Sequence, residues 1–270
     1  MKEQLSELSP RELRERFRTG QLSIPTAGFC PDYVQANLVI LSGEYAVDYE
    51  EFLRKNPKPC PVLEIIRGDR PVSNSVASGS DISTDFPLYR VYRGGELTEE
   101  TRDVAKLWKP DMVAVLIGCS LTFEAALVNA GIRIAHYENN MRVPMYDTNI
   151  PCDPVGPFSG GYVVSMRPIP ADLVDTAVRI TEPMDYAHGA PVHIGDPSKI
   201  GIRDVMHPDY GDPPVINEGD VPVFWACGVT AQAVAIHAKP DLVIAHSPGY
   251  MLITDVTIHS LQKQKGSAKS

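Results

Sequence analysis

The sequence lacks any long apolar segment. No run approaches the roughly 18 apolar residues that a membrane-spanning helix needs, and the polar N-terminus carries no apolar core typical of a signal peptide. We therefore expect a cytoplasmic location. Cysteine is also scarce: the chain has five in 270 residues, and an odd number does not indicate a disulfide framework.

Positive charge is in deficit as well. Asp and Glu number 34 against 25 Lys and Arg, which leaves a net charge of -9. Nucleic acids and anionic membranes bind basic faces, so neither is expected as the main partner. The P-loop, the G-x-G-x-x-G fingerprint and the G-x-S-x-G elbow are all missing. Their absence excludes the most easily recognised NTPases, dehydrogenases and hydrolases.

The chain does contain a repeated phrase. Residues 111–141 include Cys-Ser-Leu-Thr and residues 221–251 include Cys-Gly-Val-Thr, and each is followed by Ile-Ala-His and a later methionine. Both copies predict strand, tight turn, helix and strand, about 110 residues apart, a spacing too long for a solenoid. The predicted fold class is α/β, with two interlocked halves from an internal duplication, mixed sheets and flanking helices.

The rest of the chain predicts one packed unit. No low-complexity linker divides it, so we expect residues 1–265 to form a single unit and residues 266–270 to be a disordered tail. The turn-rich stretch 68–96 is either functional or disordered, since loops of that length are uncommon in compact domains. Phe86, Tyr89 and Tyr92 could anchor it.

The first helix is signalled at its N-terminus. Ser9 is a candidate N-cap, Pro10 occupies the first helical position and Glu12 completes a capping box.

Two cysteine turns could carry chemistry. Cys119-Ser120 and Cys227-Gly228 each follow a strand and begin a helix, where backbone N–H groups and the helix dipole favour an anion. A cysteine there is expected to have a lowered pKa, and the same turns could hold a substrate carboxylate or an oxyanion. The alternative is that both cysteines are small core residues. Thr230 is expected as an N-cap and is also a candidate substrate-binding residue.

Several histidines are further candidates. His188 and His193 lie in a Gly/Pro-rich loop with Asp196 close behind, and three roles stay open for them: acid-base catalysis, a divalent metal site or loop structure. Their spacing matches no standard zinc pattern. His246 ends a predicted buried strand, at the edge where α/β proteins bind ligands, and His136 is its repeat partner.

Arg167 is the candidate for gripping a substrate carboxylate. It follows a predicted strand, and arginine can bind a carboxylate through two parallel hydrogen bonds. The alternative is a surface ion pair.

Seven motifs resemble the D-glutamate cyclase family, whose bacterial members are named hydro-lyases. The motifs read NPKPCP, GCSLTFE, VVSMRPI, HGAPVHIGDP, GIRD, PVFWACGVT and HSPGYMLITD, and the likeness extends from about Pro10 to Asp255. The resemblance implies a lyase acting on a small amino or hydroxy acid, with dehydration of D-glutamate to 5-oxo-D-proline as the attributed activity. The alternative is a non-catalytic module that binds an acidic metabolite such as 5-oxoproline. We also expect the chain to form a homo-oligomer, specifically a homodimer.

If the chain is a lyase, the sequence predicts roles for several of these candidates. His188 or His193 would deprotonate the amine, and N–H groups at Ser120 and Gly228 would stabilise the oxyanion. Arg167 would hold the α-carboxylate. A thioester through Cys119 is a covalent variant.

Overall fold

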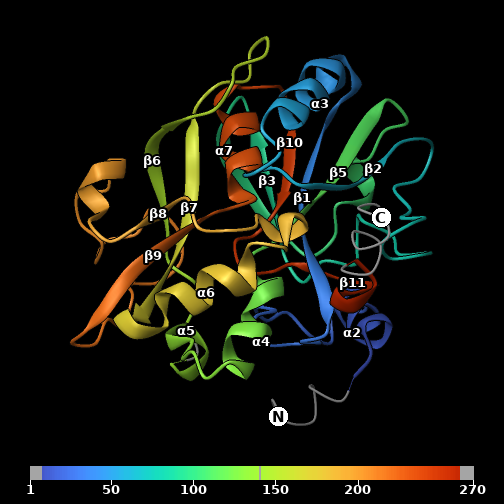
Figure 1. Cartoon of the computed structure of the whole chain (residues 1–270). Coiled ribbons are helices and arrows are strands. Elements are labelled where there is room, and N and C mark those ends of the chain that lie inside the picture. Colours follow the sequence, from blue (N-terminus) through green and yellow to red (C-terminus); the bar gives the residue numbers. More distant parts are fainter. Residues whose placement is uncertain (1–7, 140, 262–270) are drawn as a thin grey trace, which may run out of the picture.

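Two β-sheets of unequal size organise the chain (Figure 1). The computed structural model describes residues 8–139 and 141–261. Helix α7 lies between the two sheets in the view of Figure 1 and contacts strands of both, while the other helices pack around them. The predicted α/β class is confirmed. In the described part of the chain, no helix is both long and apolar enough to cross a membrane.

The larger sheet has seven strands in the order β2-β5-β1-β10-β3-β4, with β11 paired to β1. Their bounds are β1 Tyr33–Ser42, β2 Val62–Ile66, β3 Tyr89–Arg93, β4 Glu96–Thr101, β5 Met112–Gly118, β10 Val243–His246 and β11 Leu252–Thr257. Strands β1 and β5 are buried along almost their whole length. Strands of this kind are covered on both faces, which explains the unbroken apolar sequence of β5.

The smaller sheet has four strands in the order β6-β7-β9-β8. Their bounds are β6 Met145–Pro151, β7 Gly161–Pro170, β8 His193–Ile194 and β9 Asp220–Ala226. Every strand pairing described in both sheets is antiparallel, so the expectation of mixed sheets is wrong. The reason is that β9 and β10, which flank α7 in sequence, lie in different sheets and do not pair as a parallel βαβ unit.

Helix α7 lies between the sheets, and the other helices pack around them (Figure 1). Their bounds are α2 Pro10–Arg18, α3 Ala46–Lys55, α4 Leu121–Asn129, α5 Ala135–Glu138, α6 Val174–Thr181 and α7 Val229–His237. The start of α2 agrees with the sequence prediction: Ser9 accepts from the Glu12 amide, and the Glu12 carboxylate accepts from the Ser9 amide.

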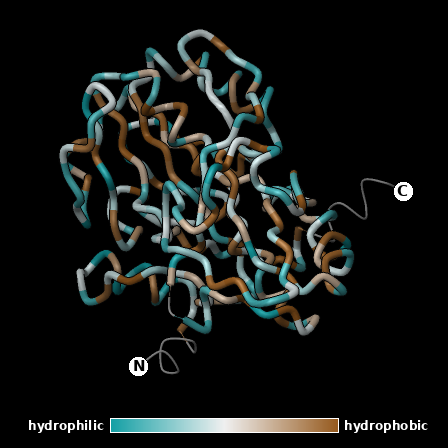
Figure 2. The backbone as a smooth tube through the Cα atoms, turned by 90° about the vertical axis from the view of Figure 1, so that its left-hand side faces the viewer, coloured by the Kyte–Doolittle hydropathy of each residue, from teal (hydrophilic) through white to brown (hydrophobic). Residues whose placement is uncertain are grey.

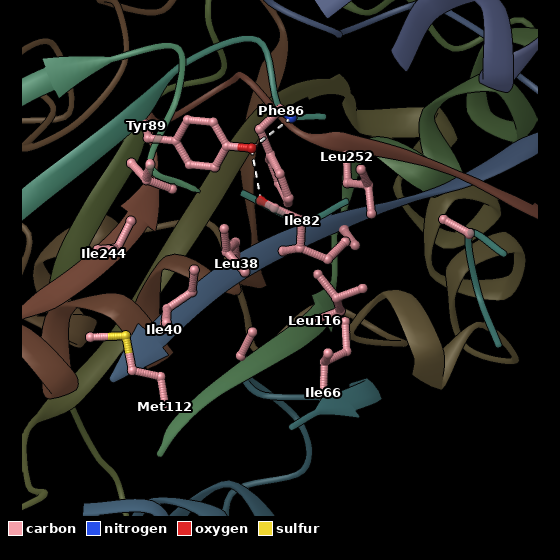
Figure 3. Close-up of a cluster of buried hydrophobic side chains, with 14 of the residues drawn as sticks. Leu38, Ile40, Ile66, Ile82, Phe86, Tyr89, Met112, Leu116, Ile244 and Leu252 are labelled. Atoms are coloured by element: carbon pink, nitrogen blue, oxygen red, sulfur yellow. Dashed lines mark hydrogen bonds between the residues drawn. The ribbon is translucent and has the colours of Figure 1, made fainter. Parts of the chain in front are cut away.

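The stretch between β2 and β3 covers one face of the larger sheet (Figure 3). Ile82 and Phe86 from this stretch pack on Leu38 and Leu116 of the central strands. The Tyr89 hydroxyl accepts from the Phe86 amide at 3.0 Å and donates to the Ile82 carbonyl at 2.8 Å. The segment is therefore ordered and contributes to the core, with Phe86 and Tyr89 as its anchors.

The opposite face of the larger sheet is covered by α3 and α7. Tyr49 and Phe52 of α3 and Val234 of α7 pack on Val39 and Val115 of the sheet. Apolar segments accordingly run through the interior strands of the backbone trace, while polar segments predominate in the outer loops (Figure 2).

The two repeats share only part of their predicted structure. β5 leads into α4 and β9 leads into α7, as expected. The strand predicted near 132–135 is absent, because this segment turns directly into the short helix α5. The second copy does continue into a strand, β10.

The halves nevertheless correspond in topology and are interlocked. β6, which follows α4, pairs with β7, and β10, which follows α7, pairs with β1. β1 and β7 are each ten residues long and lead through a 3-10 turn into a helix. Each also pairs on its other side with the strand before a cysteine turn. That the correspondence arose by duplication stays a prediction.

Candidate functional site

The two cysteine turns meet in the structure. Cys119 and Cys227 belong to one buried cluster, together with Met145 and Met251. α4 begins directly after Ser120, and α7 begins directly after Gly228. Two helix N-termini therefore converge at the junction of the sheets.

Two strand side chains hold the turns together. Asn37 of β1 donates Nδ2 to the carbonyls of Ile117 and Gly118, at 3.2 and 2.7 Å. The same carboxamide lies against Gly228, where any Cβ would collide with it. At the corresponding position of β7, the Ser165 hydroxyl lies 3.2 Å from the Ser120 hydroxyl. Sequence analysis missed Asn37, because only strand pairing brings it between the turns.

The threonines of the repeat anchor the helices to neighbouring strands. Thr122 Oγ1 accepts from the Gln35 amide at 3.1 Å, and Thr230 Oγ1 accepts from the Val163 amide at 2.9 Å. Neither is the N-cap residue, a position held by Ser120 and Gly228. Thr230 is fully buried and its hydroxyl also lies 3.2 Å from the Val163 carbonyl, so this structure shows it in a structural contact.

Arg167 lies in the interior of β7 and is almost fully buried. Its Nε and Nη2 donate to Glu124 Oε1 at 3.0 and 2.5 Å, and its Nη1 and Nη2 donate to Ser165 and Ser120. Its guanidinium also lies 5.0 Å from the centre of the Phe123 ring, within cation–π range. The structure thus shows the guanidinium occupied by Glu124 and two serines, neither on the surface nor open to a substrate carboxylate.

Glu124 is the centre of this polar cluster, and sequence analysis missed it. Burial raises the pKa of this carboxyl, but His136 and Arg167 outweigh burial and lower the pKa to about 2. His136 Nε2 lies 3.1 Å from Glu124 Oε1. The Glu124 carboxylate therefore lies beside the imidazole, although the contact at Nε2 does not have hydrogen-bond geometry.

The second half holds a neutral counterpart of this pair. Gln232 occupies the position of α7 that Glu124 occupies in α4, and its Nε2 lies 2.5 Å from His246 Nδ1. His246 Nδ1 also accepts from the Leu38 amide at 3.1 Å. Burial lowers the pKa of His246 to about 3, so the ring is neutral at physiological pH. The first repeat has Glu124 where the second has Gln232. This difference was the sequence signal that could have identified Glu124.

His246 does not lie at the carboxyl edge of a parallel sheet, where sequence analysis placed it. β10 is antiparallel to both of its neighbours, so strand ends of one polarity do not gather there. The ring is buried within the larger sheet against Phe86. Its Nδ1 accepts the hydrogen bond of the Leu38 amide of β1.

The expectation of thiolate cysteines is wrong for this structure. Burial raises the pKa of Cys227 to about 11 and raises the pKa of Cys119 further, although backbone N–H groups of Leu121 and Val229 oppose the shift. Desolvation therefore outweighs the helix dipole.

His188 and His193 lie in different surroundings. His188 is buried, and its Nδ1 lies 3.0 Å from the Lys58 carbonyl, while Lys58 Nζ donates to the carbonyls of His188 and Ala190. Burial, with the charges of Lys58 and Arg167, lowers the pKa of His188 to about 4. His193 is partly exposed, with Nε2 at 2.7 Å from the Asp196 carbonyl.

The proposed metal ligands do not form a metal-binding group. The Asp196 carboxylate caps the Ser198 amide at 3.0 Å. Across residues 8–139 and 141–261, no group of three or more His, Cys, Asp or Glu side chains is arranged to hold a metal ion.

A narrow cleft opens beside His136. Its walls include Met141, Arg142, Met166 and Pro213, and it has a volume of about 10 Å³, enough for about one water molecule. Arg142 pairs with Asp212, with Nη2 at 2.8 Å from Oδ1. The cleft thus places a positively charged side chain near the Glu124–His136 pair.

Comparisons with known proteins agree with the sequence motifs. The family model of D-glutamate cyclase matches residues 113–255. A Bacillus velezensis protein named "Putative hydro-lyase" is 54% identical over 261 residues, covering 97% of this chain and 99% of that protein. A Bacillus subtilis protein, "Putative hydro-lyase YcsI", is 50% identical over 254 residues, covering 94% and 99%.

Among solved structures, a nitrogen repressor-like protein from Methanococcus jannaschii matches with a TM-score of 0.38 and 8% identity, covering 90% of this chain and 97% of that one. Similarity at this level supports no conclusion about the fold or the function of this chain.

Proposed function

The chain belongs to the D-glutamate cyclase family, and on that premise we propose that it is a hydro-lyase that cyclises D-glutamate to 5-oxo-D-proline with loss of water. The reaction takes place at the cleft beside His136. The observation that supports this choice is the buried Arg167–Glu124–His136 series, in which a carboxylate held ionised contacts a histidine that lines the cleft.

The chemistry of this reaction needs a group that relays protons. The amine nitrogen of D-glutamate forms a bond to the side-chain carboxyl carbon, and one carbon–oxygen bond of that carboxyl breaks. An ammonium group carries three protons, of which the lactam nitrogen keeps one and the leaving water takes two. No net proton is consumed, so a base that takes protons from nitrogen and returns them to oxygen is sufficient.

His136 is the side chain placed for this relay. Histidine can accept and release a proton near neutral pH, and the Glu124 carboxylate beside it stabilises the imidazolium that forms. Arg167 does not touch the substrate in this scheme. It is a positioning residue that keeps Glu124 ionised and holds Ser120 at the start of α4.

Two further groups would bind the substrate. Arg142 is paired with Asp212 at the wall of the cleft, and a substrate carboxylate would replace Asp212 on this guanidinium as the cleft widens. The N–H groups at the converging N-termini of α4 and α7 would stabilise the developing oxyanion. The covalent variant through Cys119 is disfavoured, because burial raises the pKa of that thiol.

The test is product formation by the purified chain. D-glutamate, L-glutamate and related acids are incubated separately, with and without divalent metal, and 5-oxoproline is measured by chiral chromatography. We expect His136→Gln to lower kcat by at least 100-fold, in the range typical of lost acid-base catalysis. His193→Ala is the matched control and should keep wild-type turnover, since this ring lies outside the cluster. Full activity in His136→Gln would contradict the proposal.

The binding-module alternative makes a different prediction in the same experiment. A module that only binds 5-oxoproline or a similar acid would show saturable binding by calorimetry and no turnover of any acid. That result would remove the lyase assignment while leaving the family assignment intact.

A further inference from the structure

A larger cavity lies at the other end of α7 from the cysteine turns. It has a volume of about 480 Å³, within the range of small-molecule sites. The C-terminal half of α7 forms one wall, and the β3–β4 hairpin and β6 form others. The cavity is therefore distinct from the cleft beside His136.

The cavity has a carboxylate on one side. Asp147 of β6 lines it, and the Tyr210 hydroxyl lies 3.4 Å from Asp147 Oδ1. Tyr92 of β3 adds a second aromatic ring to the lining. A carboxylate beside two aromatic rings is suited to an ammonium group, which is attracted both by the negative charge and by the ring faces.

A histidine and a lysine line another part of the wall. His237 ends α7 and Lys239 follows it, and both side chains are exposed at the cavity. A carboxylate could bind there. Two glycines shape this wall: Gly95 lies close to Lys239, and Gly160 lies close to Val234.

The backbone at Lys239 provides an independent observation. This residue adopts a φ of 54°, in the left-handed region just after the end of α7. Glycine is the residue usually found at this position, because other residues are strained there. A lysine anywhere in the last turn of α7 would interact favourably with the helix dipole, so the dipole alone does not explain its presence at this position. Strained residues of this kind gather at functional sites.

We propose that this cavity binds a small zwitterionic α-amino acid, with its ammonium group at Asp147, Tyr92 and Tyr210 and its carboxylate at Lys239 and His237. The site is separate from the catalytic cluster, and its occupancy does not depend on the function proposed above. Because α7 carries the Gly228 turn at one end and Lys239 at the other, the ligand would contact the same helix that contributes to the candidate active site.

The first test is calorimetry with one variant chosen to preserve the fold. Glycine, D-alanine and D-glutamate are titrated one at a time into the His136→Gln protein, so that catalysis does not interfere. Lys239→Gly removes the ammonium and also relieves the backbone strain, so its melting temperature should be equal or higher. We expect Lys239→Gly to weaken amino-acid binding at least tenfold. Lys106→Gly, which removes one exposed lysine away from the cavity, should leave binding unchanged.

The second test separates the two ends of the ligand. Asp147→Asn should weaken binding of the amino acids at least fivefold, and acetate or methylammonium alone should each bind at least tenfold more weakly than the amino acid. Amino-acid binding that is equal in the Lys239→Gly and parent proteins would overturn the inference, as would an absence of binding at millimolar concentration. If the wild-type protein converts D-glutamate but Lys239→Gly and Asp147→Asn bind amino acids as tightly as the parent, only this inference fails. If both variants show the expected loss of binding and the wild-type protein converts no acid, only the proposed reaction fails.

Discussion

At the scale of single residues, the account depends on which arginine meets the substrate. Sequence analysis chose Arg167, but this guanidinium is occupied by Glu124, Ser120 and Ser165. Arg142 lies at the cleft with one carboxylate partner that a substrate can replace.

We therefore predict that Arg142→Lys raises KM for D-glutamate about tenfold while kcat changes little. Lysine keeps the charge but cannot form the two parallel hydrogen bonds of a guanidinium. Steady-state kinetics measures both constants, and Arg203→Lys on the exposed surface serves as the control. An unchanged KM would show that Arg142 does not bind the substrate.

Glu124 allows stability and catalysis to be separated. Glu124→Gln leaves Arg167 buried without an anionic partner, so the free energy of unfolding at pH 7 should fall by about 3 kcal/mol. The double variant Glu124→Gln, Arg167→Met should recover much of that stability, because it removes the isolated charge. It should not recover kcat. Recovery of turnover along with stability would mean that Glu124 has only a structural role.

The same residue predicts a dependence on pH. Its pKa is lowered from 4.5 to about 2 in the folded protein. The stabilisation is therefore present above pH 4.5 and is lost as the pH falls toward 2. Denaturation of the wild type and of Glu124→Gln at several pH values should show the difference between them shrinking over that interval.

At the scale of elements, the convergence of α4 and α7 depends on contact between Gly228 and Asn37. Gly228→Ala should destabilise the protein by about 3 kcal/mol, because the new Cβ collides with the buried carboxamide. Asn37→Gly should also destabilise it. The double variant should be more stable than the sum of the two effects predicts, since the collision is gone. Strict additivity in urea denaturation would contradict the contact.

Local sequence patterns correctly predicted several single helices and strands. The capping box predicted the start of α2 at Pro10, and the apolar run before Cys119 predicted β5. The strand expected near 132–135 was wrong, because a short apolar stretch does not distinguish a strand from a turn that enters a helix.

The arrangement of the site was harder to predict than its elements. The turns were recognised because helix starts have a local signature. Asn37 and Glu124 were missed because their roles depend on partners far away in the chain, such as the Gly228 turn and Arg167. Parallel-sheet reasoning misplaced His246, since strand direction depends on pairings that no local pattern contains.

At the scale of the whole molecule, two buried histidines make stability sensitive to mild acid. The pKa is lowered from 6.5 to about 4 for His188 and to about 3 for His246, so the unfolded chain binds their protons more readily. Stability is then lost as the pH falls below 6.5. Between pH 7 and pH 5 we expect a loss of about 4 kcal/mol from the two together. Urea denaturation at both pH values measures this loss, and a flat profile would contradict the burial of neutral rings.

Strand pairing between the two halves makes each half dependent on the other. Because β10 pairs with β1 and β6 pairs with β7, neither half completes its sheet without the other. This arrangement places the Glu124–His136 pair of one half beside Arg167 of the other, so the candidate site exists only in the assembled molecule.

The most direct measurement of the central claim uses D-glutamate labelled with ¹⁸O in both oxygens of its side-chain carboxyl. The account predicts that the wild-type chain forms 5-oxo-D-proline that retains one label in its lactam carbonyl, with the other label in water, as detected by mass spectrometry. His136→Gln should form this product at least 100-fold more slowly, and His193→Ala should match the wild type. Absence of product from the wild type, or an undiminished rate in His136→Gln, would contradict the claim.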